Sequence, residues 1–262
     1  MRNRRGRHGD EARAERRRAR RAYLLPSAFT IGNILLGFYA IVRGYRGDFQ
    51  AASLLIFTAA VLDALDGRIA RMTGTDSDFG REYDSLADVL TFGAAPALLA
   101  YLWGLEDYGR IGWLIPLYYL VCTATRLARF NVQTRVVDSR YFVGLPSPAA
   151  AGGLASILFF APDVTWKAWS ASLLLLALVC LGTLEVSTFR YRSPKQLDLR
   201  RPLSYRVVLP IAAVLLVVAY HPPAVFLAMA VIYSLSGPVA WLIGRLRSRP
   251  APPPPEQAAR PT

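Results

Sequence analysis

Apolar residues run along the chain in long blocks that lack the regular polar face of a soluble amphipathic helix or strand. A helix that crosses the hydrocarbon core of a bilayer needs about 20 predominantly apolar residues. Eight blocks approach this length, and the first and fifth are short enough to require tilt or local thinning of the bilayer. We therefore predict an all-α, polytopic membrane bundle with eight transmembrane helices: Ser27–Val42, Ala51–Ala70, Ser85–Leu105, Ile111–Leu127, Pro148–Ala161, Trp169–Phe189, Tyr205–Tyr220 and Ala224–Ile243.

The composition agrees with a membrane bundle. Hydrophobic residues make up 53% of the 262 residues, and a chain this apolar must bury its surface, which excludes a disordered protein. Cys122 and Cys180 are the only cysteines, and both lie within apolar blocks. We interpret them as buried hydrophobic residues, so the sequence predicts neither a disulfide framework nor a thiolate metal site.

Positive charge is distributed unevenly, and its distribution indicates the orientation of the bundle. With the N-terminus placed in the cytoplasm, the segments on that side hold 27 Lys and Arg residues, and the loops on the other side hold 4. Cytoplasmic loops of membrane proteins carry an excess of Lys and Arg. We therefore expect a multi-pass protein of the cytoplasmic membrane with both termini and the active site inside, and we expect no cleaved signal peptide.

The two ends of the chain have the composition of disordered segments. Residues 1–22 contain ten Arg, and we interpret them as an arm that lies against anionic lipid headgroups rather than as an arm that binds nucleic acid. Residues 246–262 form a tail that is rich in Pro from Pro250 to Pro255, and such a tail cannot pack into a core.

Acidic residues are concentrated near the junction of the second and third predicted helices. Seven of the 18 acidic residues lie between Asp63 and Asp88, and four of these fall within or at the ends of membrane helices. An ionisable residue at membrane depth is costly and is by default a functional candidate. Asp63 and Asp66 are three residues apart and share one helix face, and Asp84 and Asp88 are four residues apart and share a face of the next helix.

The segment between the two pairs, Thr73–Phe79, is short and rich in Gly, Thr, Ser and Asp, so we expect a turn between antiparallel helices. This turn would bring the four carboxylates together, and they cannot all stay ionised side by side without counter-charge. Oxygen ligands of this kind suit Mg²⁺ or Mn²⁺, which also bind substrate phosphates. We predict a site for two divalent ions that supports displacement at phosphorus.

Small and basic neighbours of the aspartates fit such a site. Gly67 and Gly80 remove side chains where a phosphate must approach the backbone closely. Arg71 lies one turn after Gly67 and is placed to bind a phosphate oxygen. The alternative interpretation is that the acids only form ion pairs with Arg68, Arg71 and Arg81 at the membrane edge. Four acids at this spacing, together with both glycines, favour the metal site.

The residues between Asp63 and Asp88 also resemble a family signature. The pattern Asp-x2-Asp-Gly-x2-Ala-Arg-x8-Gly-x3-Asp-x3-Asp is similar to that of the CDP-alcohol phosphatidyltransferases, and its fixed positions are filled at Asp63, Asp66, Gly67, Ala70, Arg71, Gly80, Asp84 and Asp88. The resemblance covers about residues 23–200. It implies a membrane enzyme, usually a homodimer, with a six-helix catalytic core. Such an enzyme transfers a phosphatidyl group from CDP-diacylglycerol to an alcohol and releases CMP.

Flanking segments resemble the phosphatidylserine synthase branch of that family, in which L-serine is the acceptor. The branch that accepts glycerol phosphate typically has Pro after the third aspartate and Lys after the fourth, where this chain has Ser85 and Val89. The segments that carry the resemblance are Thr30-Ile31-Gly32-Asn33, Phe79-Gly80-Arg81-Glu82-Tyr83-Asp84-Ser85-Leu86-Ala87-Asp88-Val89, Phe92-Gly93-Ala94-Ala95-Pro96-Ala97, Arg126-Leu127-Ala128-Arg129-Phe130-Asn131, Gly144-Leu145-Pro146-Ser147-Pro148-Ala149 and Val186-Ser187-Thr188-Phe189-Arg190-Tyr191.

The resemblance implies a role for each residue of the predicted site. Asp63, Asp66 and Asp84 would bind metal, and Asp88 would complete the metal site and serve as the general base. The residues that we assign to contacts with CDP-diacylglycerol are Asp63, Gly67, Arg71, Gly80 and Asn33.

Serine carries a carboxylate and an ammonium group, so its site requires at least one cation besides the metals. Arg126, Arg129 and Asn131 lie at the end of the fourth predicted helix, at the depth of the aspartates, and we predict that they bind serine. Snorkelling of Arg126 and Arg129 to lipid phosphates is the alternative explanation, and the sequence leaves it open.

The expected organisation follows from these assignments. We predict an arm at residues 1–22, a catalytic membrane domain at residues 23–200, two additional membrane helices within residues 201–245 and a tail at residues 246–262. The expected partners are CDP-diacylglycerol, L-serine, membrane lipids and a second copy of the chain, without nucleic acid.

Other functions remain possible from the sequence alone. The nearest is a sister enzyme that accepts glycerol phosphate or inositol phosphate, or that uses an archaeal-type lipid donor. Membrane prenyltransferases also have Asp-rich motifs, but these are normally separated by several helices. An ion transporter would need acids deep in several helices, and Glu185 is the only acid within a predicted helix outside the cluster.

Overall fold

A computed structural model describes residues 28–73, 78–133, 141–162, 168–192 and 220–247. The described chain begins with a helix at Ala28–Tyr45. The elements after it are α2 (Phe49–Thr73), α3 (Asp78–Asp88), the π-helical turn η1 (Val89–Ala94), α4 (Ala95–Gly104), the short 3₁₀ helix η2 (Glu106–Tyr108), α5 (Gly109–Gln133), β1 (Tyr141–Val143), α6 (Ser147–Phe160), α7 (Ala168–Val186), β2 (Arg190–Arg192) and α9 (Pro222–Arg247).

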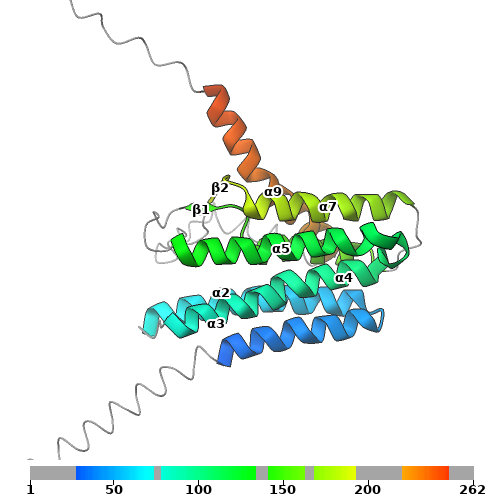
Figure 1. Cartoon of the computed structure of the whole chain (residues 1–262), viewed down its shortest axis with the longest axis horizontal. Coiled ribbons are helices and arrows are strands. Elements are labelled where there is room, and N and C mark those ends of the chain that lie inside the picture. The colour runs from blue at the N-terminus through cyan, green and yellow to red at the C-terminus, as the bar shows by residue number, and fades with distance from the viewer. Residues whose placement is uncertain (1–27, 74–77, 134–140, 163–167, 193–219, 248–262) are drawn as a thin grey trace, which may run out of the picture.

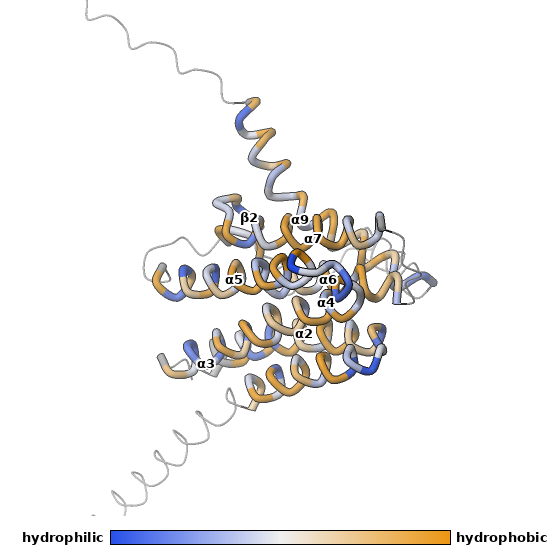
Figure 2. The backbone as a smooth tube through the Cα atoms, turned by 45° about the vertical axis from the view of Figure 1, so that its right-hand side comes forward, coloured by the Kyte–Doolittle hydropathy of each residue, from blue (hydrophilic) through white to orange (hydrophobic). Residues whose placement is uncertain are grey.

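The predicted all-α membrane architecture is confirmed. Six helices of the described chain are long and apolar enough to cross a membrane: Ala28–Tyr45, Phe49–Ile69, Phe79–Gly104, Glu106–Val132, Trp169–Val186 and Pro222–Leu246. A seventh apolar helix, Ser147–Phe160, is shorter. Figure 2 shows hydrophobic residues along the helices and hydrophilic residues gathered mainly near their ends. The chain is therefore a multi-pass membrane protein.

Some predicted features lie outside the described residues. These are the arm at residues 1–22, the turn at residues 74–77, the predicted helix Tyr205–Tyr220 up to residue 219 and most of the tail at residues 246–262. The predicted number of eight helices therefore stays a prediction.

Helices extend beyond the predicted spans at the end of the bundle where the aspartates lie. The third begins at Asp78 instead of Ser85, and α5 continues to Gln133 instead of ending at Leu127. The added turns contain polar residues. Spans that are predicted from hydropathy end where the apolar residues end, although the backbone continues as a helix. Consequently, Asp84 lies within α3, before the start of the predicted apolar span but on the helix that it was expected to share with Asp88.

The helices form one bundle in which α5 has a central place. Figure 1 shows α2, the α3–α4 helix, α5 and α7 running side by side, while the last part of α9 leaves the bundle at an angle. The helix α5 packs along α7, and α6 packs against α2 and α9. Fully buried side chains from several helices make the core, among them Ile56, Phe92, Leu99, Tyr119, Leu154 and Leu178.

A small antiparallel ladder was not expected from the sequence. Residues Tyr141–Val143 of β1 pair with Arg190–Arg192 of β2. The chain then enters α6 through Gly144, whose φ of +82° favours glycine. The backbone N–H of Gly144 donates to the carbonyl of Phe189 at 2.8 Å, and that of Leu145 donates to the carbonyl of Leu184 at 2.9 Å. These bonds tie the start of α6 to the end of α7.

The helix α9, which lies outside the expected six-helix core, is joined to the bundle through a buried tyrosine. Tyr191 of β2 is fully buried, and a Cβ atom at Gly237 of α9 would lie only 2.5 Å from its ring. Burial raises the pKa of Tyr191 to about 12, so its hydroxyl stays protonated at neutral pH. That hydroxyl donates to the carbonyl of Ser234 at 2.9 Å.

The first helix approaches the α3–α4 helix closely at Gly37. A Cβ atom at this position would lie 2.6 Å from Oγ1 of Thr91, a residue of η1. The Thr91 hydroxyl donates to the carbonyl of Asn33 at 3.1 Å, so the two helices are joined by packing and by a hydrogen bond.

We expect Gly37→Ala to destabilise the protein by about 1–3 kcal/mol, because the added methyl group overpacks a close helix contact. Thermal unfolding in detergent measures the effect. Gly152→Ala in α6 is the matched control, since a Cβ atom at Gly152 would meet nothing within 4 Å. Equal melting temperatures for the two variants would contradict the close approach at Gly37.

Candidate active site

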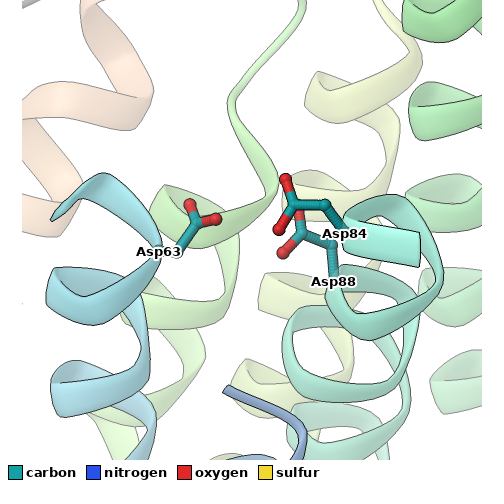
Figure 3. Close-up of side chains that lie close together, drawn as sticks. All are labelled: Asp63, Asp84 and Asp88. Atoms are coloured by element: carbon teal, nitrogen blue, oxygen red, sulfur yellow. The ribbon is translucent and has the colours of Figure 1, made fainter. Parts of the chain in front are cut away.

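Four aspartates lie at one end of the bundle, on two helices joined by a short connection. Asp63 and Asp66 belong to the last turns of α2, and Asp84 and Asp88 belong to α3. The i, i+3 and i, i+4 spacings keep each pair on one helix face. Figure 3 shows the carboxylate of Asp63 pointing across from α2 toward those of Asp84 and Asp88.

Three of the four carboxylates form a compact group. Asp63, Asp84 and Asp88 each offer one oxygen, and these three oxygens lie within 4.8 Å of one another. Asp66 lies outside this group. Its Oδ2 accepts a hydrogen bond from the Thr30 hydroxyl at 3.3 Å, whereas its Oδ1 is buried without a hydrogen-bond partner in the described chain.

This donor set fits a divalent cation. All three groups offer carboxylate oxygens, which are the ligands that Mg²⁺ and Mn²⁺ prefer. Asp88 is only 9% exposed, and three like charges at this separation repel one another strongly away from bulk water. The buried Oδ1 of Asp66 is a further oxygen to which no group of the described residues donates. A cation between the carboxylates would relieve this repulsion.

Asn33 of the first helix contacts the aspartate group directly. It is 2% exposed, and its Nδ2 donates to Oδ1 of Asp88 at 3.4 Å. Its own Oδ1 is buried without a hydrogen-bond partner in the described chain. The sequence placed Asn33 among the contacts with CDP-diacylglycerol, and the structure brings it to the side of Asp88.

The turn that follows Asp88 is a π-helix, η1, and hydrogen bonds join it to α5 and to the first helix. The hydroxyl of Tyr119, from α5, donates to the carbonyl of Phe92 at 3.0 Å, and the Thr91 hydroxyl reaches the carbonyl of Asn33. π-Helical turns occur frequently at functional sites. Here the turn begins directly after Asp88 and is held by buried hydrogen bonds.

Arg126 of α5 lies in the interior beside the aspartates. It is 7% exposed, and its Nη1 donates to the Ser147 hydroxyl of α6 at 3.0 Å. Its guanidinium interacts electrostatically with Asp88 and with Glu185 of α7. A cation at this depth is not snorkelling to the bilayer surface, so that alternative is excluded for Arg126 by its burial.

Arg129, one turn further along α5, has different surroundings. Its Nη1 donates to the carbonyl of Val186 at 2.8 Å. Its Nη2 lies within 3.5 Å of three further carbonyl oxygens, those of Val143, Glu185 and Ser187. Carbonyls at a helix C-terminus lack intrahelical donors. Arg129 therefore supplies donors to the end of α7 and joins it to β1.

Asn131, the third residue that we assigned to serine binding, joins α5 to α3. Its Nδ2 donates to the Ser85 hydroxyl at 3.0 Å and to Oε2 of Glu82 at 3.2 Å. The structure thus brings Arg126 to the aspartate group, while Arg129 and Asn131 contact other parts of the chain. The serine-binding role of these residues stays a prediction.

The residues assigned to CDP-diacylglycerol lie at the same end of the bundle. Asp63 and Gly67 are one turn apart on α2, and Gly80 lies one turn before Asp84 on α3. A Cβ atom at Gly67 would meet nothing within 4 Å, so there is open space beside the site. The side chain of Arg71 lies outside the described part of the structure.

Three further residues near the site were not assigned to it from the sequence. Thr30 bonds to Asp66, Ser147 bonds to Arg126, and Glu185 lies near Arg126. A signal for Thr30 was available, because Thr30 and Asn33 are polar residues three apart in an apolar helix. Glu185 interrupts the apolar block Trp169–Phe189, and this was a signal as well. For Ser147 the signal was its place in the segment Gly144–Ala149, one of those that carry the family resemblance.

Known proteins are similar to this chain in the region of the site and beyond it. Residues 23–190 match the family described as CDP-alcohol phosphatidyltransferase. A Helicobacter pylori protein named CDP-diacylglycerol–serine O-phosphatidyltransferase is 37% identical over 221 residues, which cover 84% of this chain and 92% of the relative. A Bacillus subtilis protein with the same name is 40% identical over 135 residues, covering 52% of this chain and 75% of the relative. An archaetidylserine synthase of Methanothermobacter thermautotrophicus is 38% identical over 134 residues, covering 50% of this chain and 56% of the relative.

Proposed function

The chain belongs to the CDP-alcohol phosphatidyltransferase family, and we infer that it transfers the phosphatidyl group from CDP-diacylglycerol to the hydroxyl of L-serine. The products are phosphatidylserine and CMP. The observation that carries this conclusion is the convergence of Asp63, Asp84 and Asp88 at positions of the family signature. The acceptor follows from the Helicobacter pylori relative, whose similarity extends over most of both chains.

We propose that Asp63, Asp66, Asp84 and Asp88 hold Mg²⁺ or Mn²⁺, with two ions as the expected number. A bound divalent ion would neutralise charge on the diphosphate of CDP-diacylglycerol and on the leaving CMP. The separation of the carboxylate oxygens in the described group supports this proposal. The carboxylates, which come from α2 and α3, would orient the diphosphate between these two helices.

Asp88 is the proposed general base. It lies deepest along α3 of the aspartates and receives a hydrogen bond from Asn33, which fixes the direction of its carboxylate. In the proposed step, Asp88 accepts the proton of the serine hydroxyl while the hydroxyl oxygen forms a bond to the phosphorus that bears diacylglycerol. The bond from that phosphorus to the CMP oxygen breaks. We assign Gly67, Gly80 and Arg71 to binding of the nucleotide diphosphate.

The membrane setting of the reaction is also part of the proposal. The excess of Lys and Arg at the end of the bundle that carries the site favours a cytoplasmic orientation in the cytoplasmic membrane. We further propose that the protein is a homodimer, as the family resemblance implies.

A second candidate differs in its lipid donor. The archaetidylserine synthase relative supports an archaeal-type donor with the same acceptor. Purified protein assayed with either CDP-diacylglycerol or the CDP-activated archaeal lipid, and with serine, glycerol phosphate or inositol phosphate, tests both candidates. Phosphatidylserine formation from CDP-diacylglycerol is the expected result. Turnover with a phosphorylated acceptor but not with serine would contradict the proposal.

The two arginines of α5 are expected to respond differently to replacement by lysine. Arg126→Lys keeps the charge but loses the planar fork that binds a carboxylate through two N–H groups. We expect the KM for serine to rise about tenfold or more, because a hydrogen bond to a charged group contributes ~1.5–3 kcal/mol. The KM for CDP-diacylglycerol should stay nearly unchanged. Steady-state kinetics with each substrate varied in turn measure both values.

Arg129→Lys is the matched comparison. It removes donors from the carbonyls at the end of α7, so its main expected effect is a lower melting temperature. A serine KM that rises only in Arg129→Lys would assign the acceptor site to Arg129 instead of Arg126.

A further inference from the structure

The helix α3 carries two of the three grouped aspartates, and several of its other side chains face outward. Phe79 is 74% exposed and Leu86 is 68% exposed. The neighbouring helix against which α3 packs is α5, and Figure 1 shows the two running beside each other. The position of Asp84 relative to Asp63 of α2 therefore depends on how α3 is held against α5.

Asn131, near the end of α5, makes a polar contact with α3. Its Nδ2 donates to Oγ of Ser85 at 3.0 Å and to Oε2 of Glu82 at 3.2 Å. Oδ1 of Asn131 also lies 3.3 Å from Oγ of Ser85 and can accept its proton. Glu82 and Ser85 are three residues apart and so share one face of α3. A single amide group of α5 thus bonds to two consecutive turns of that face.

The side chains that Asn131 holds belong to the same short helix as the carboxylates of the site. Ser85 directly follows Asp84 and lies three residues before Asp88. Figure 3 shows Asp84 and Asp88 on the side of α3 that faces Asp63. The hydrogen bonds within a helix make one turn move as a unit, so a displacement of α3 at Ser85 also displaces Asp84.

Repulsion within the aspartate group acts against this arrangement. Oxygens of Asp63, Asp84 and Asp88 lie within 4.8 Å of one another, and like charges at this separation repel, most strongly away from bulk water. The repulsion favours a wider separation of α3 from α2. Ligand groups that are already in place bind more tightly, because ordering them costs nothing on binding. The hydrogen bonds of Asn131 to α3 keep two of the three carboxylates in place.

We propose that Asn131 is a positioning residue of the metal site, whose amide holds α3 against α5 so that Asp84 and Asp88 stay within reach of Asp63. This inference rests on the proposed function, because it assumes that the aspartate group binds a divalent ion. Asn131 acts through its bonds to α3, without contact with the metal or the substrate. This role differs from the serine binding that was predicted for Asn131 from the sequence.

Asn131→Ala tests the proposal, because it removes the amide that bonds to α3. The electron paramagnetic resonance signal of free Mn²⁺ measures Mn²⁺ binding to the purified protein in detergent without turnover. We expect the dissociation constant for Mn²⁺ to rise about tenfold, because an outer-shell partner of a metal site contributes about 10–100-fold to affinity. At saturating Mn²⁺ the KM for serine should change less than about twofold.

Thr125→Val is the matched control on the same helix. The Thr125 hydroxyl donates to the carbonyl of Val121 at 2.7 Å, a bond within α5. Its removal should change neither the dissociation constant for Mn²⁺ nor the KM for serine.

Ser85 offers a second test from the other side of the contact. Ser85→Ala should also weaken Mn²⁺ binding, and the double variant with Asn131→Ala should bind Mn²⁺ no more weakly than Asn131→Ala alone, because both changes remove one contact. Ser85→Thr should bind Mn²⁺ as the wild type does. Threonine keeps the hydroxyl, which in a helix can bond to the carbonyl four residues earlier, as Ser85 does with Arg81 at 3.0 Å.

Three results would overturn the proposal while the wild type binds Mn²⁺. The first is an unchanged affinity for Mn²⁺ in Asn131→Ala, even if its melting temperature falls. The second is a higher serine KM in that variant at saturating Mn²⁺, which would assign Asn131 to the acceptor site. The third is a multiplication of the effects of the Asn131 and Ser85 variants. A wild-type protein that binds no Mn²⁺ would contradict the proposed metal site itself.

Discussion

Replacement of Asp63 or Asp84 by asparagine is expected to abolish CMP release while the protein stays inserted in the membrane. Each residue offers one oxygen to the group of three carboxylates, and asparagine keeps the size of the side chain but removes its charge. We expect activity to fall by more than about 10²-fold, because even an outer-shell partner of a metal site contributes about 10–100-fold. The membrane helices should remain, since both residues lie at the ends of apolar spans.

Release of CMP from CDP-diacylglycerol in the presence of serine measures this loss. Asp107→Asn, at an exposed acid in η2, is the matched control and should keep wild-type activity. Excess chelator should reproduce the loss in the wild-type protein, and added Mg²⁺ or Mn²⁺ should restore its activity. Full activity in excess chelator would contradict the proposed metal site.

Asp88→Asn is expected to stop the chemical step while binding of CDP-diacylglycerol is largely kept. Asp88 differs from the other aspartates because Asn33 donates to it and Arg126 lies near it. Removal of a general base typically lowers kcat by about 10²–10⁴-fold. Three carboxylates remain in this variant to hold the metal and the diphosphate, so the affinity for the lipid donor should decrease little.

Direct binding of CDP-diacylglycerol to Asp88→Asn and Asp84→Asn distinguishes the two roles. The Asp84 variant should bind the donor weakly, and the Asp88 variant should bind it nearly as well as the wild type. Should the two variants lose affinity equally, the separate base role is wrong and Asp88 is one more metal ligand.

Much of the site followed from local spacing. A helix repeats every 3.6 residues, so the pairing of Asp63 with Asp66 and of Asp84 with Asp88 on two helix faces depended only on the residues between them. The short connection between the pairs then required the two faces to lie at the same end of the bundle. Hydropathy alone likewise indicated a multi-pass membrane protein, because apolar blocks of this length require a bilayer.

Hydropathy located the membrane spans less well where the helices become polar. The first turns of α3 contain polar and charged residues, so the predicted apolar span began at Ser85, although the spacing of Asp84 and Asp88 had already placed both on one helix face. Backbone hydrogen bonds continue a helix beyond its apolar part. The hydropathy of the side chains, from which the spans were predicted, carries no information about these backbone hydrogen bonds. The pairing of β1 with β2 was missed for a related reason, since three-residue strands have no recognisable period.

The sequence by itself determined the family, the membrane bundle and the four aspartates, because each depends on residues close together in the chain. The tertiary structure separated Asp66, which bonds to Thr30, from the group of three. It also distinguished Arg126, buried beside Asp88, from Arg129, which donates to carbonyls at the end of α7. The position of Glu185 near Arg126 was likewise visible only in the structure. These differences arise from contacts between helices that are far apart in the chain, those of the first helix with α2 and those of α5 with its neighbours. Such contacts leave no periodic spacing in the sequence from which they could be predicted.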